Sequence, residues 1–287
     1  METFWERLKS LISEDAACRG INDLASADEL RRAVEFSMSS SNIAIFTGFT
    51  IMPLIKCETD GPVGAVFLAR GLLDLGKRVS IWTDDIYADV LRKGINFLSV
   101  NVPVYGVPFK WSGNFLGLFW QEGFDLLISV ERPGRAIDGK YYSSRNEDIS
   151  CYVSPLDELF IEAGRKNIPT IGIGDGGNEI GMGNIRGELL NRFPSKGNIF
   201  SIVKVDSLII SGVSNWGAYG LLAGLAKLSG KGNMLPDPSE EKLFLKVIVE
   251  SGSVDGVTLK TAETVDGVSG DTLSKKLREI ASCLEDF

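Results

Sequence analysis

The sequence predicts an α/β fold: a doubly wound, mostly parallel sheet with helices on both faces. From about residue 40 onward, short β-rich runs alternate with helix-like stretches, a pattern typical of βαβ units. Hydrophobic residues make up 44% of the 287 residues and charged residues 24%, which favours a globular core and excludes disorder as the main state. We expect one domain over 1–287, with helical extensions over 1–40 and 236–287.

The first expected element is an amphipathic helix whose apolar residues share one face. We expect this face to dock on the body of the protein or on a second subunit, so a homo-oligomer is compatible with it. A helix lying on a membrane is disfavoured because the polar face is not basic. The apolar residues are Phe4, Trp5, Leu8, Leu11 and Ile12.

Six β-rich runs follow, and each has the length of a buried strand. Because Pro103 has no backbone N–H to donate, we expect the third run at an edge of the sheet. The expected strands cover residues 42–46, 78–82, 102–105, 124–130, 169–173 and 207–210.

Helix-like stretches lie between most of these runs, over residues 61–76, 156–166 and 216–228. The first has Pro62 in its first turn and Gly76 at its end, where these residues favour a helix start and stop. In the tail, Asp237 and Pro238 begin another helix, and residues 272–284 form the last one. A five-residue segment at 254–258 (VDGVT) is echoed at 265–269 (VDGVS), which we interpret as coincidence rather than a repeat.

Composition excludes several classes of function. The chain has no histidine, which removes Ser-His-Asp and Cys-His nucleophilic sites and the common zinc sites. Its net charge of −8 disfavours binding to nucleic acid or to an anionic membrane surface. The N-terminal segment lacks the apolar core of a signal peptide, and no apolar run is long enough to span a membrane. Four scattered cysteines favour a reducing cytoplasm.

Acidic residues follow most of the expected strands. In a parallel sheet the carboxyl ends of the strands share one edge, so these side chains are expected to converge there. Carboxylates gathered at one edge repel each other unless a cation binds, protons are retained or the substrate is cationic. We expect one or two hard divalent ions, Mg²⁺ or Mn²⁺ with Ca²⁺ as a further candidate. The expected ligands are Glu58, Asp60, Asp84, Glu131, Asp175 and Glu179.

The segment from Gly172 to Gly177 fits the glycine pattern of dinucleotide-binding loops. However, Asp175 lies inside the turn and Glu179 just beyond it, where a pyrophosphate would need backbone N–H groups. No P-loop motif is present. We therefore expect no NAD, FAD, PLP or haem. Arg132 and Arg135 follow a buried strand, and their guanidinium groups suit a carboxylate or a phosphate.

Three segments in this order resemble the D-glutamate cyclase family: 58–65 (ETDGPVGA), 131–135 (ERPGR) and 172–183 (GIGDGGNEIGMG). The likeness runs from about Thr47 to Gly220, and Val63 stands where the family would have a second Pro. The resemblance implies a lyase of D-amino acid metabolism, which converts D-glutamate to 5-oxo-D-proline and water.

The residues can be matched to that chemistry without histidine. A carboxyl of raised pKa would take the ammonium proton and return it to the departing oxygen. We expect the catalytic residues to be Asp175, Glu179, Glu131 and Asp60, and Arg132 or Arg135 to hold the α-carboxylate. The expected substrate-binding residues are Thr47, Gly48, Arg132, Arg135, Gly176, Gly177, Asn178, Ser214 and Asn215.

Two other functions use the same acidic residues. One is a Mg²⁺- or Mn²⁺-dependent phosphatase or other hydrolase, whose substrate would be a phosphate ester rather than an acidic amino acid. The other is a metal-binding or amino-acid-binding module without catalysis. Turnover of a generic phosphate ester would favour the first, and binding without turnover the second.

Overall fold

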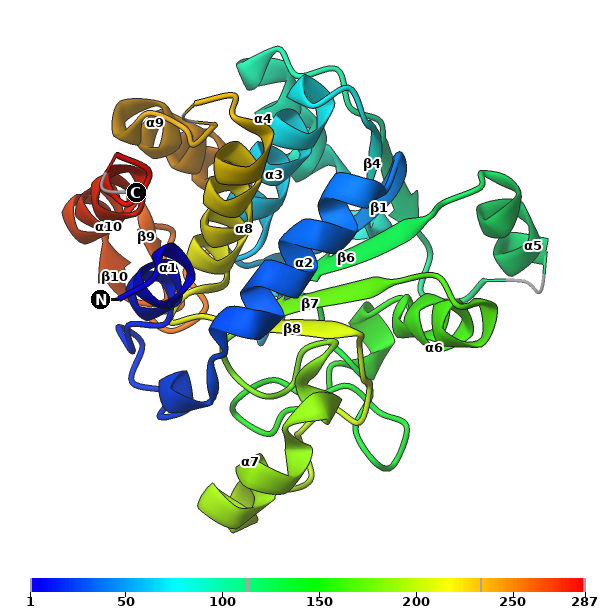
Figure 1. Cartoon of the computed structure of the whole chain (residues 1–287). Coiled ribbons are helices and arrows are strands. Elements are labelled where there is room, and N and C mark those ends of the chain that lie inside the picture. Colours follow the sequence, from blue (N-terminus) through cyan, green and yellow to red (C-terminus); the bar gives the residue numbers. More distant parts are fainter. Residues whose placement is uncertain (1, 112–113, 233, 286–287) are drawn as a thin grey trace.

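The centre of the molecule is a six-stranded parallel sheet (Figure 1). The computed structural model describes residues 2–111, 114–232 and 234–285, so residues 1, 286 and 287 of the expected extensions lie outside the described residues. The strand order is β5-β4-β1-β6-β7-β8. The strands are β1 (Asn42–Thr47), β4 (Arg78–Asp84), β5 (Val104–Val107), β6 (Leu126–Val130), β7 (Thr170–Gly174) and β8 (Ser207–Ile210).

The winding of the chain changes direction beside β1. The chain first builds outward through β4 to β5, then returns to pair β6 with the other side of β1 before adding β7 and β8. In doubly wound sheets of this order, ligands bind beyond the carboxyl ends of the strands at the point where the direction changes. The junction of β1 and β6 is therefore the first place to look for a site.

Helices cover both faces of the sheet, as expected from the alternating pattern. One face carries α2 (Ala27–Ser39), α3 (Pro62–Asp74), α4 (Ala88–Leu98) and α8 (Ser214–Ser229). The other carries α5 (Asn114–Gln121) and α6 (Asp157–Lys166), which pack on aromatic residues of β1 and β4. A short helix, α7 (Arg186–Arg192), lies near the glycine-rich segment after β7.

The strand predictions are confirmed in place, with small shifts at their ends. The expected strand at 102–105 begins two residues later, after Pro103, and lies at an edge of the sheet as predicted. The expected strand at 42–46 extends to Thr47, and the one at 78–82 extends to Asp84. These extensions put three polar side chains, those of Thr47, Thr83 and Asp84, on the strands themselves, at the carboxyl ends where the site lies.

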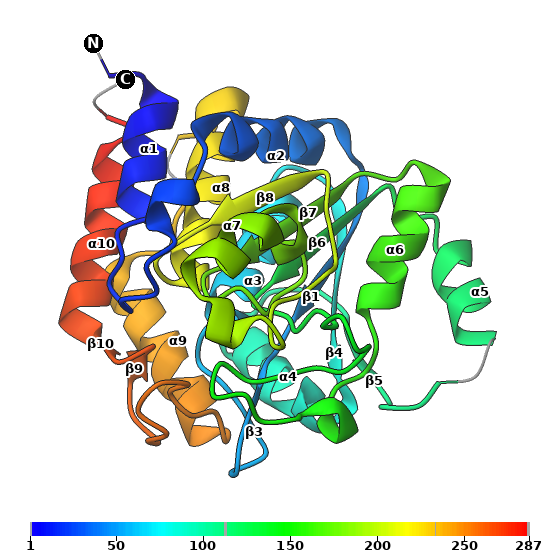
Figure 2. The same ribbon diagram turned by 90° about the horizontal axis from the view of Figure 1, so that it is seen from below.

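The two ends of the chain form an outer layer on the face covered by α8. Helix α1 (Phe4–Ile12) contacts α2 and α8, and it lies beside α10 (Gly270–Ser282) (Figures 1 and 2). Helix α9 (Pro238–Glu250) packs on α4 and α10, and its first turn is capped by the Asp237 side chain. The apolar face of α1 thus docks on the body, as expected. A single domain remains our interpretation of this arrangement.

Two small hairpins complete the fold near the site. The first pairs β2 (Thr50–Ile51) with β3 (Lys56–Cys57), and the second pairs β9 (Thr264–Val265) with β10 (Val268–Ser269). Among the described residues, no helix has the length and apolar character needed to cross a membrane.

Candidate active site

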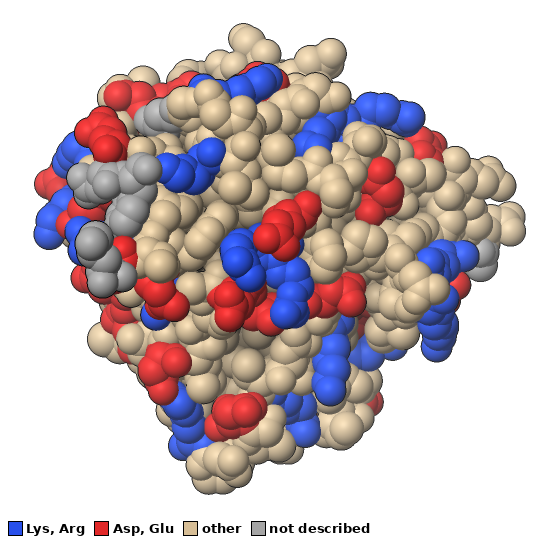
Figure 3. All heavy atoms as spheres, viewed as in Figure 1, with Lys and Arg blue, Asp and Glu red and all other residues tan. Residues whose placement is uncertain are grey.

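Six buried carboxyl groups converge beyond the ends of β1, β6 and β7, and we call them the acidic cluster. Their exposed fractions lie between 1% and 6%. Five were expected from the sequence, and the sixth comes from the turn between β9 and β10. The acidic cluster consists of Glu58, Asp60, Glu131, Asp175, Glu179 and Asp266. On the molecular face shown in Figure 3, by contrast, acidic and basic side chains are interspersed.

Asp60 is positioned by the first turn of α8. Its Oδ2 accepts from the Ser214 N–H at 2.8 Å, and its Oδ1 accepts from the Asn215 N–H at 2.8 Å. Asn215 also connects α8 to α3, because its Oδ1 accepts from the N–H groups of Gly61 and Gly64 at the start of α3. Two helices therefore begin at the acidic cluster, and the positive ends of their dipoles favour negative charge there.

Glu131 adopts a left-handed backbone conformation, with φ of 46°. This conformation is costly for a residue with a Cβ atom. The Glu131 side chain accepts from the Ser214 hydroxyl at 2.5 Å, so it points toward α8. Gly61 lies directly against it: a Cβ atom on Gly61 would come within 2.6 Å of the Glu131 Cβ, and the φ of Gly61 is +90°. Only glycine fits this close approach.

The glycine-rich loop after β7 is held by its own carboxylate. Glu179 accepts from the Gly176 N–H at 2.8 Å and from the Gly177 N–H at 2.7 Å. A pyrophosphate would require such backbone N–H groups, and here they are already used. The Asn178 side chain donates to the Tyr142 carbonyl at 2.8 Å, which ties this loop to the segment after Arg135.

Asp175 lies at the centre of the cluster, and its Oδ2 is buried without a hydrogen-bond partner among the described residues. This oxygen lies 3.5 Å from Nε of Arg19, which is too long and unaligned for a hydrogen bond. Arg19 also pairs with Asp266, at 2.6 Å. The Arg19 guanidinium is thus the positive group that contacts the acidic cluster.

Burial and mutual repulsion raise the pKa values of four cluster carboxyls. Burial raises the pKa of Asp60 to about 8, and the charge of Asp266 adds to this effect. Burial likewise holds the pKa values of Glu58, Glu131 and Asp175 well above their usual range. The charges of Asp266 and Asp60 add to the raised pKa of Glu58, and the charge of Arg19 opposes it.

Two groups of cluster oxygens have the spacing of a metal site. Glu131, Asp175 and Glu179 form one, and Asp60, Asp175 and Asp266 form the other. Within each group, one oxygen per residue lies within 4.8 Å of the others. Hard divalent cations prefer such oxygen ligands, and Asp175, whose Oδ2 has no hydrogen-bond partner among the described residues, belongs to both groups. The residues therefore fit a divalent ion.

The structure does not bring Asp84, Arg132 and Arg135 into the acidic cluster. The Arg132 guanidinium is fully buried against both Asp84 oxygens, and it also donates to the carbonyls of Gly48 and Ser154. Arg135 donates to both oxygens of Asp157, at 2.6 and 2.9 Å. Both arginines expected to hold a substrate carboxylate are thus already paired.

Of the two residues at the end of β1, Thr47 lies beside Glu131 and Gly48 does not. The Thr47 hydroxyl is buried without a hydrogen-bond partner among the described residues. It lies 2.9 Å from where a Cβ of Gly61 would be, and the same position is 2.6 Å from the Glu131 Cβ. Gly48 has a φ of +103° and turns the chain away from the sheet toward β2, and its carbonyl accepts from Arg132.

A small pocket opens onto the acidic cluster. Its volume is about 20 Å³, which holds a water molecule but not an amino acid. Three segments cover it: the β2–β3 hairpin, residues 143–145 and the loop at Gly256. Arg145 joins two of them by donating to the Gly256 and Val257 carbonyls at 2.8 and 2.9 Å. Some of this cover must move for a substrate to enter.

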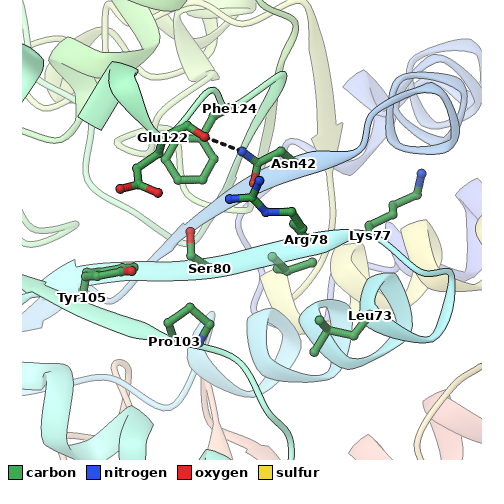
Figure 4. A pocket seen from close by; sticks show the side chains of 10 residues that line it. Asn42, Leu73, Lys77, Arg78, Ser80, Pro103, Tyr105, Glu122 and Phe124 are labelled. Atoms are coloured by element: carbon green, nitrogen blue, oxygen red, sulfur yellow. Dashed lines mark hydrogen bonds between the residues drawn. The ribbon is translucent and has the colours of Figure 1, made fainter. Parts of the chain in front are cut away.

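A larger pocket lies at the amino ends of the strands, on the side of the sheet opposite the acidic cluster (Figure 4). It has a volume of about 300 Å³ and is lined by the first residues of β1 and β4, including Asn42, Arg78 and Ser80. The Asn42 side chain donates to the Glu122 carbonyl there. Parallel sheets bind ligands beyond the carboxyl ends of their strands, so the position of this pocket does not favour catalysis.

Sequence reasoning missed two residues of the site, Arg19 and Asp266. Arg19 follows α1, in a segment that carries none of the recognised motifs. Asp266 lies in the VDGVS segment, whose likeness to 254–258 was interpreted as coincidence. The two segments are in fact linked, because Asp255 accepts from the Gly267 N–H at 2.8 Å and from the Thr264 hydroxyl at 2.6 Å. The repeated Asp-Gly pair was thus the signal that pointed to the missing carboxylate.

Comparisons with known proteins agree with the resemblance in the motifs. The family model for "D-glutamate cyclase-like, C-terminal" matches residues 8–281. The human protein "D-glutamate cyclase, mitochondrial" is 37% identical over 236 residues, which cover 76% of this chain and 38% of that protein. The chain therefore spans well under half the length of this relative.

Solved structures give weaker likenesses. An exopolyphosphatase-related protein from Bacteroides fragilis has a TM-score of 0.38 and 12% identity, over 91% of this chain and 58% of that chain. RecJ from Thermus thermophilus, crystallised with Mn²⁺, has a TM-score of 0.37 and 13% identity, over 90% of this chain and 36% of that chain. These scores are too low to support a functional argument. The family model and the human relative, however, show that this chain belongs to the D-glutamate cyclase-like family and matches its C-terminal region.

Proposed function

We propose that this chain catalyses the cyclisation of D-glutamate to 5-oxo-D-proline with loss of water. The observation that carries the proposal is the acidic cluster, which gathers carboxyls of raised pKa around the unpartnered Asp175 oxygen. Family membership supports the reaction and the substrate. The human relative's activity is carried over as part of this proposal.

The reaction moves two protons within one substrate. The amine nitrogen attacks the γ-carboxyl carbon, a C–N bond forms, and a C–O bond breaks. The ammonium group loses two protons in total, and the departing oxygen gains two and leaves as water. Because the attacking and attacked groups belong to one molecule, the protein needs to orient them rather than bring two molecules together.

Glu58 is suited to carry these protons. It lines the pocket, and burial holds its pKa well above the usual range. A carboxyl whose pKa is raised toward neutral pH can accept a proton from an ammonium group and later donate it. Asp175 and Glu179 also line the pocket, where their negative charge would attract the substrate ammonium group. Asp60 keeps α8 in place.

A divalent ion, Mg²⁺ or Mn²⁺, is part of the proposal. We propose Glu131, Asp175 and Glu179 as its ligands, because their oxygens are grouped and all three residues line the pocket. When bound, such an ion supplies Lewis-acid polarisation of a carboxylate. The four cysteines are free, which supports the cytoplasm as the compartment we propose.

Proton NMR tests the activity directly. Purified protein is incubated with Mn²⁺ and either D-glutamate or L-glutamate, and ring product is separated from open substrate by its chemical shifts. We expect 5-oxo-D-proline to form, L-glutamate to react much more slowly, and EDTA to slow the reaction. Absence of ring product with Mn²⁺, Mg²⁺ and Ca²⁺ from pH 6 to 9 would contradict the proposal. Hydrolysis of a phosphate ester in the same samples would then support a phosphatase.

A further inference from the structure

We propose that Arg19 binds the α-carboxylate of D-glutamate, and that Asp266 is a positioning residue which holds the Arg19 guanidinium for this purpose. The inference rests on the proposed function and names the group that recognises its substrate. It replaces Arg132 and Arg135 in the role that the sequence suggested for them.

The first argument is the position of Arg19. Its side chain lines the same pocket as Glu58, Glu131 and Asp175, and 23% of it is exposed. Its Nε is buried and has no hydrogen-bond partner among the described residues. A guanidinium group presents a planar set of N–H donors that matches a carboxylate. Arg19 therefore lines the pocket and has a donor, Nε, that no described residue uses.

The second argument is that the neighbouring arginines are already used. Arg132 is bound to Asp84, and Arg135 to Asp157. Arg145 also lines the pocket, but its guanidinium donates to two backbone carbonyls. Moving any of these groups to a substrate would leave a buried carboxylate or carbonyl without its partner, which is costly. Arg19 has the looser contact, 3.5 Å to Asp175.

The third argument is electrostatic. D-glutamate carries two carboxylates and must approach six buried carboxyls, which repel it. The α-carboxylate needs a positive partner there, and Arg19 is the cation that contacts the cluster. Its 2.6 Å pair with Asp266 fixes one side of the guanidinium, while the contact with Asp175 can be exchanged for the substrate.

Hydrogen bonds and close packing fix the segment that carries Arg19 and the turn that carries Asp266 before any substrate binds. Asp15 accepts from the N–H groups of Arg19 and Gly20 at 2.6 and 2.9 Å. The chain just before them crosses Gly212 so closely that a Cβ there would come within 1.7 Å of the Glu14 carbonyl oxygen. On the other side, Asp255 fixes the turn that contains Asp266. An anchor preorganised in this way loses little freedom on binding.

An α-carboxylate anchor also accounts for discrimination between D- and L-glutamate. Arg19 would fix the carboxylate, the acidic cluster the ammonium group, and the rest of the pocket the side chain. Three fixed substituents on one carbon admit one enantiomer in the reactive arrangement. Loss of Arg19 should therefore weaken the preference for D-glutamate as well as its binding.

The test compares D-glutamate with 4-aminobutyrate, which has the same amine and terminal carboxylate but no α-carboxylate. We expect Arg19→Met to lower kcat/KM for D-glutamate by about 10- to 100-fold, the loss typical of a hydrogen bond to a charged group. The value for 4-aminobutyrate should stay within about twofold, because that substrate has no α-carboxylate to lose. Arg19→Lys should be intermediate, and Asp266→Asn should raise KM more than it lowers kcat.

Arg192→Met is the matched control. Arg192 supports the same N-terminal segment by donating to the Gly20 carbonyl, and it pairs with the exposed Asp23 away from the pocket. The control should leave the ratio of the two substrates unchanged. Thermal unfolding of each variant shows whether it is folded, and Arg19→Lys retains the charge if Arg19→Met does not fold.

Calorimetric binding of D-glutamate separates this inference from the proposed function. If wild-type protein forms no ring product, the proposed function fails, and binding still tests Arg19. Weaker binding of D-glutamate to the Arg19 variants, with unchanged binding to the Arg192 variant, supports the inference. An unchanged ratio of kcat/KM values, or unchanged binding where there is no turnover, overturns it.

Discussion

Two buried charged regions meet at the carboxyl ends of the strands, and they differ in charge balance. In the paired region, Arg132 faces Asp84 and Arg135 faces Asp157, so each carboxylate has a guanidinium of its own. In the acidic cluster, Arg19 contacts two of the six carboxyls, Asp175 and Asp266. Glu131 belongs to the cluster and the next residue, Arg132, to the paired region.

The comparison separates charges that stabilise the fold from charges that remain free for chemistry. A buried ion pair cannot bind a new ligand without breaking contacts that are costly to lose. Where buried carboxyls outnumber the positive groups around them, some of the carboxyls must retain a proton or bind a metal ion. Bound protons and metal ions can be exchanged during a reaction. The excess of acid, rather than burial, is what marks the candidate site.

The largest expected effect is on activity, in the acidic cluster. Asp175→Asn removes a charge from an oxygen that has no hydrogen-bond partner among the described residues. We expect the rate of cyclisation to fall by about 10²- to 10⁴-fold, with no loss of thermal stability. NMR assays and unfolding curves measure the two quantities. Asp148→Asn, at an exposed carboxylate paired with Lys140, should leave the rate unchanged. A folded Asp175 variant with wild-type activity would contradict the assignment.

The next effect is on stability, in the paired region. Arg132→Met leaves Asp84 buried without its guanidinium, and we expect a loss of about 3–5 kcal/mol in the free energy of unfolding. Urea denaturation measures this loss. The exposed pair of Arg192 and Asp23 is the control, because Arg192→Met should leave the free energy of unfolding nearly unchanged. Similar losses in the two variants would show that the buried pair does not have the structural role we give it.

A third prediction concerns pH and metal. Asp60 has a pKa of about 8 in the folded protein, above its unfolded value. The free energy of unfolding that protonated Asp60 contributes is therefore fully present at low pH and is lost as the pH rises through 8. The raised pKa values of Glu58, Glu131 and Asp175 act in the same direction. Without a divalent ion, the protein should become less stable from pH 6 to pH 9.

Mn²⁺ should offset this loss, because it binds the deprotonated carboxylates. At one hundred times its dissociation constant, a ligand of the folded state stabilises by about 2.7 kcal/mol. The increase in Tm on adding Mn²⁺ should be larger at pH 8.5 than at pH 6.5, and absent in an Asp175→Asn, Glu179→Gln double variant. An equal increase in the double variant would place the ion elsewhere.

The smallest effect belongs to a buried carboxyl outside both regions. Glu241 accepts from the Tyr219 hydroxyl at 2.8 Å, and burial raises its pKa to about 7. Its contribution to stability is lost as the pH rises toward and beyond 7. Glu241→Gln should thus be more stable than wild type by about 1–2 kcal/mol at pH 8 and similar to it at pH 5. Glu250→Gln, at an exposed position, should show no such difference between the two pH values.

The sequence was sufficient to predict the sheet because each strand carries its own local signal. The runs at 42–46 and 207–210 are apolar over the length of a strand, and the parallel order follows from the helices between them. The carboxylates after β6 and β7 were predictable for the same reason, since they directly follow their strands. The edge position of the third run followed from Pro103.

The rest of the site depends on contacts that no local pattern records. Asp84 and Glu131 both follow apolar strands, and nothing in either segment shows that one meets a guanidinium and the other does not. The φ of Glu131 turns its side chain toward α8 and leaves Arg132 to face Asp84. Arg19 and Asp266 enter the site through the packing of α1 against α10, which is decided by tertiary contacts alone.

The pair of Arg19 and Asp266 has a consequence for how the protein is made. The two residues are 247 positions apart in the chain, so a ribosome synthesises Arg19 long before Asp266. Until then, the carboxyls after β3, β6 and β7 are present while the turn that fixes the guanidinium is missing. Closing so long a loop is an entropic cost that only completed packing offsets. The order of synthesis thus makes the pairing of Arg19 with Asp266 form after the sheet that supports it.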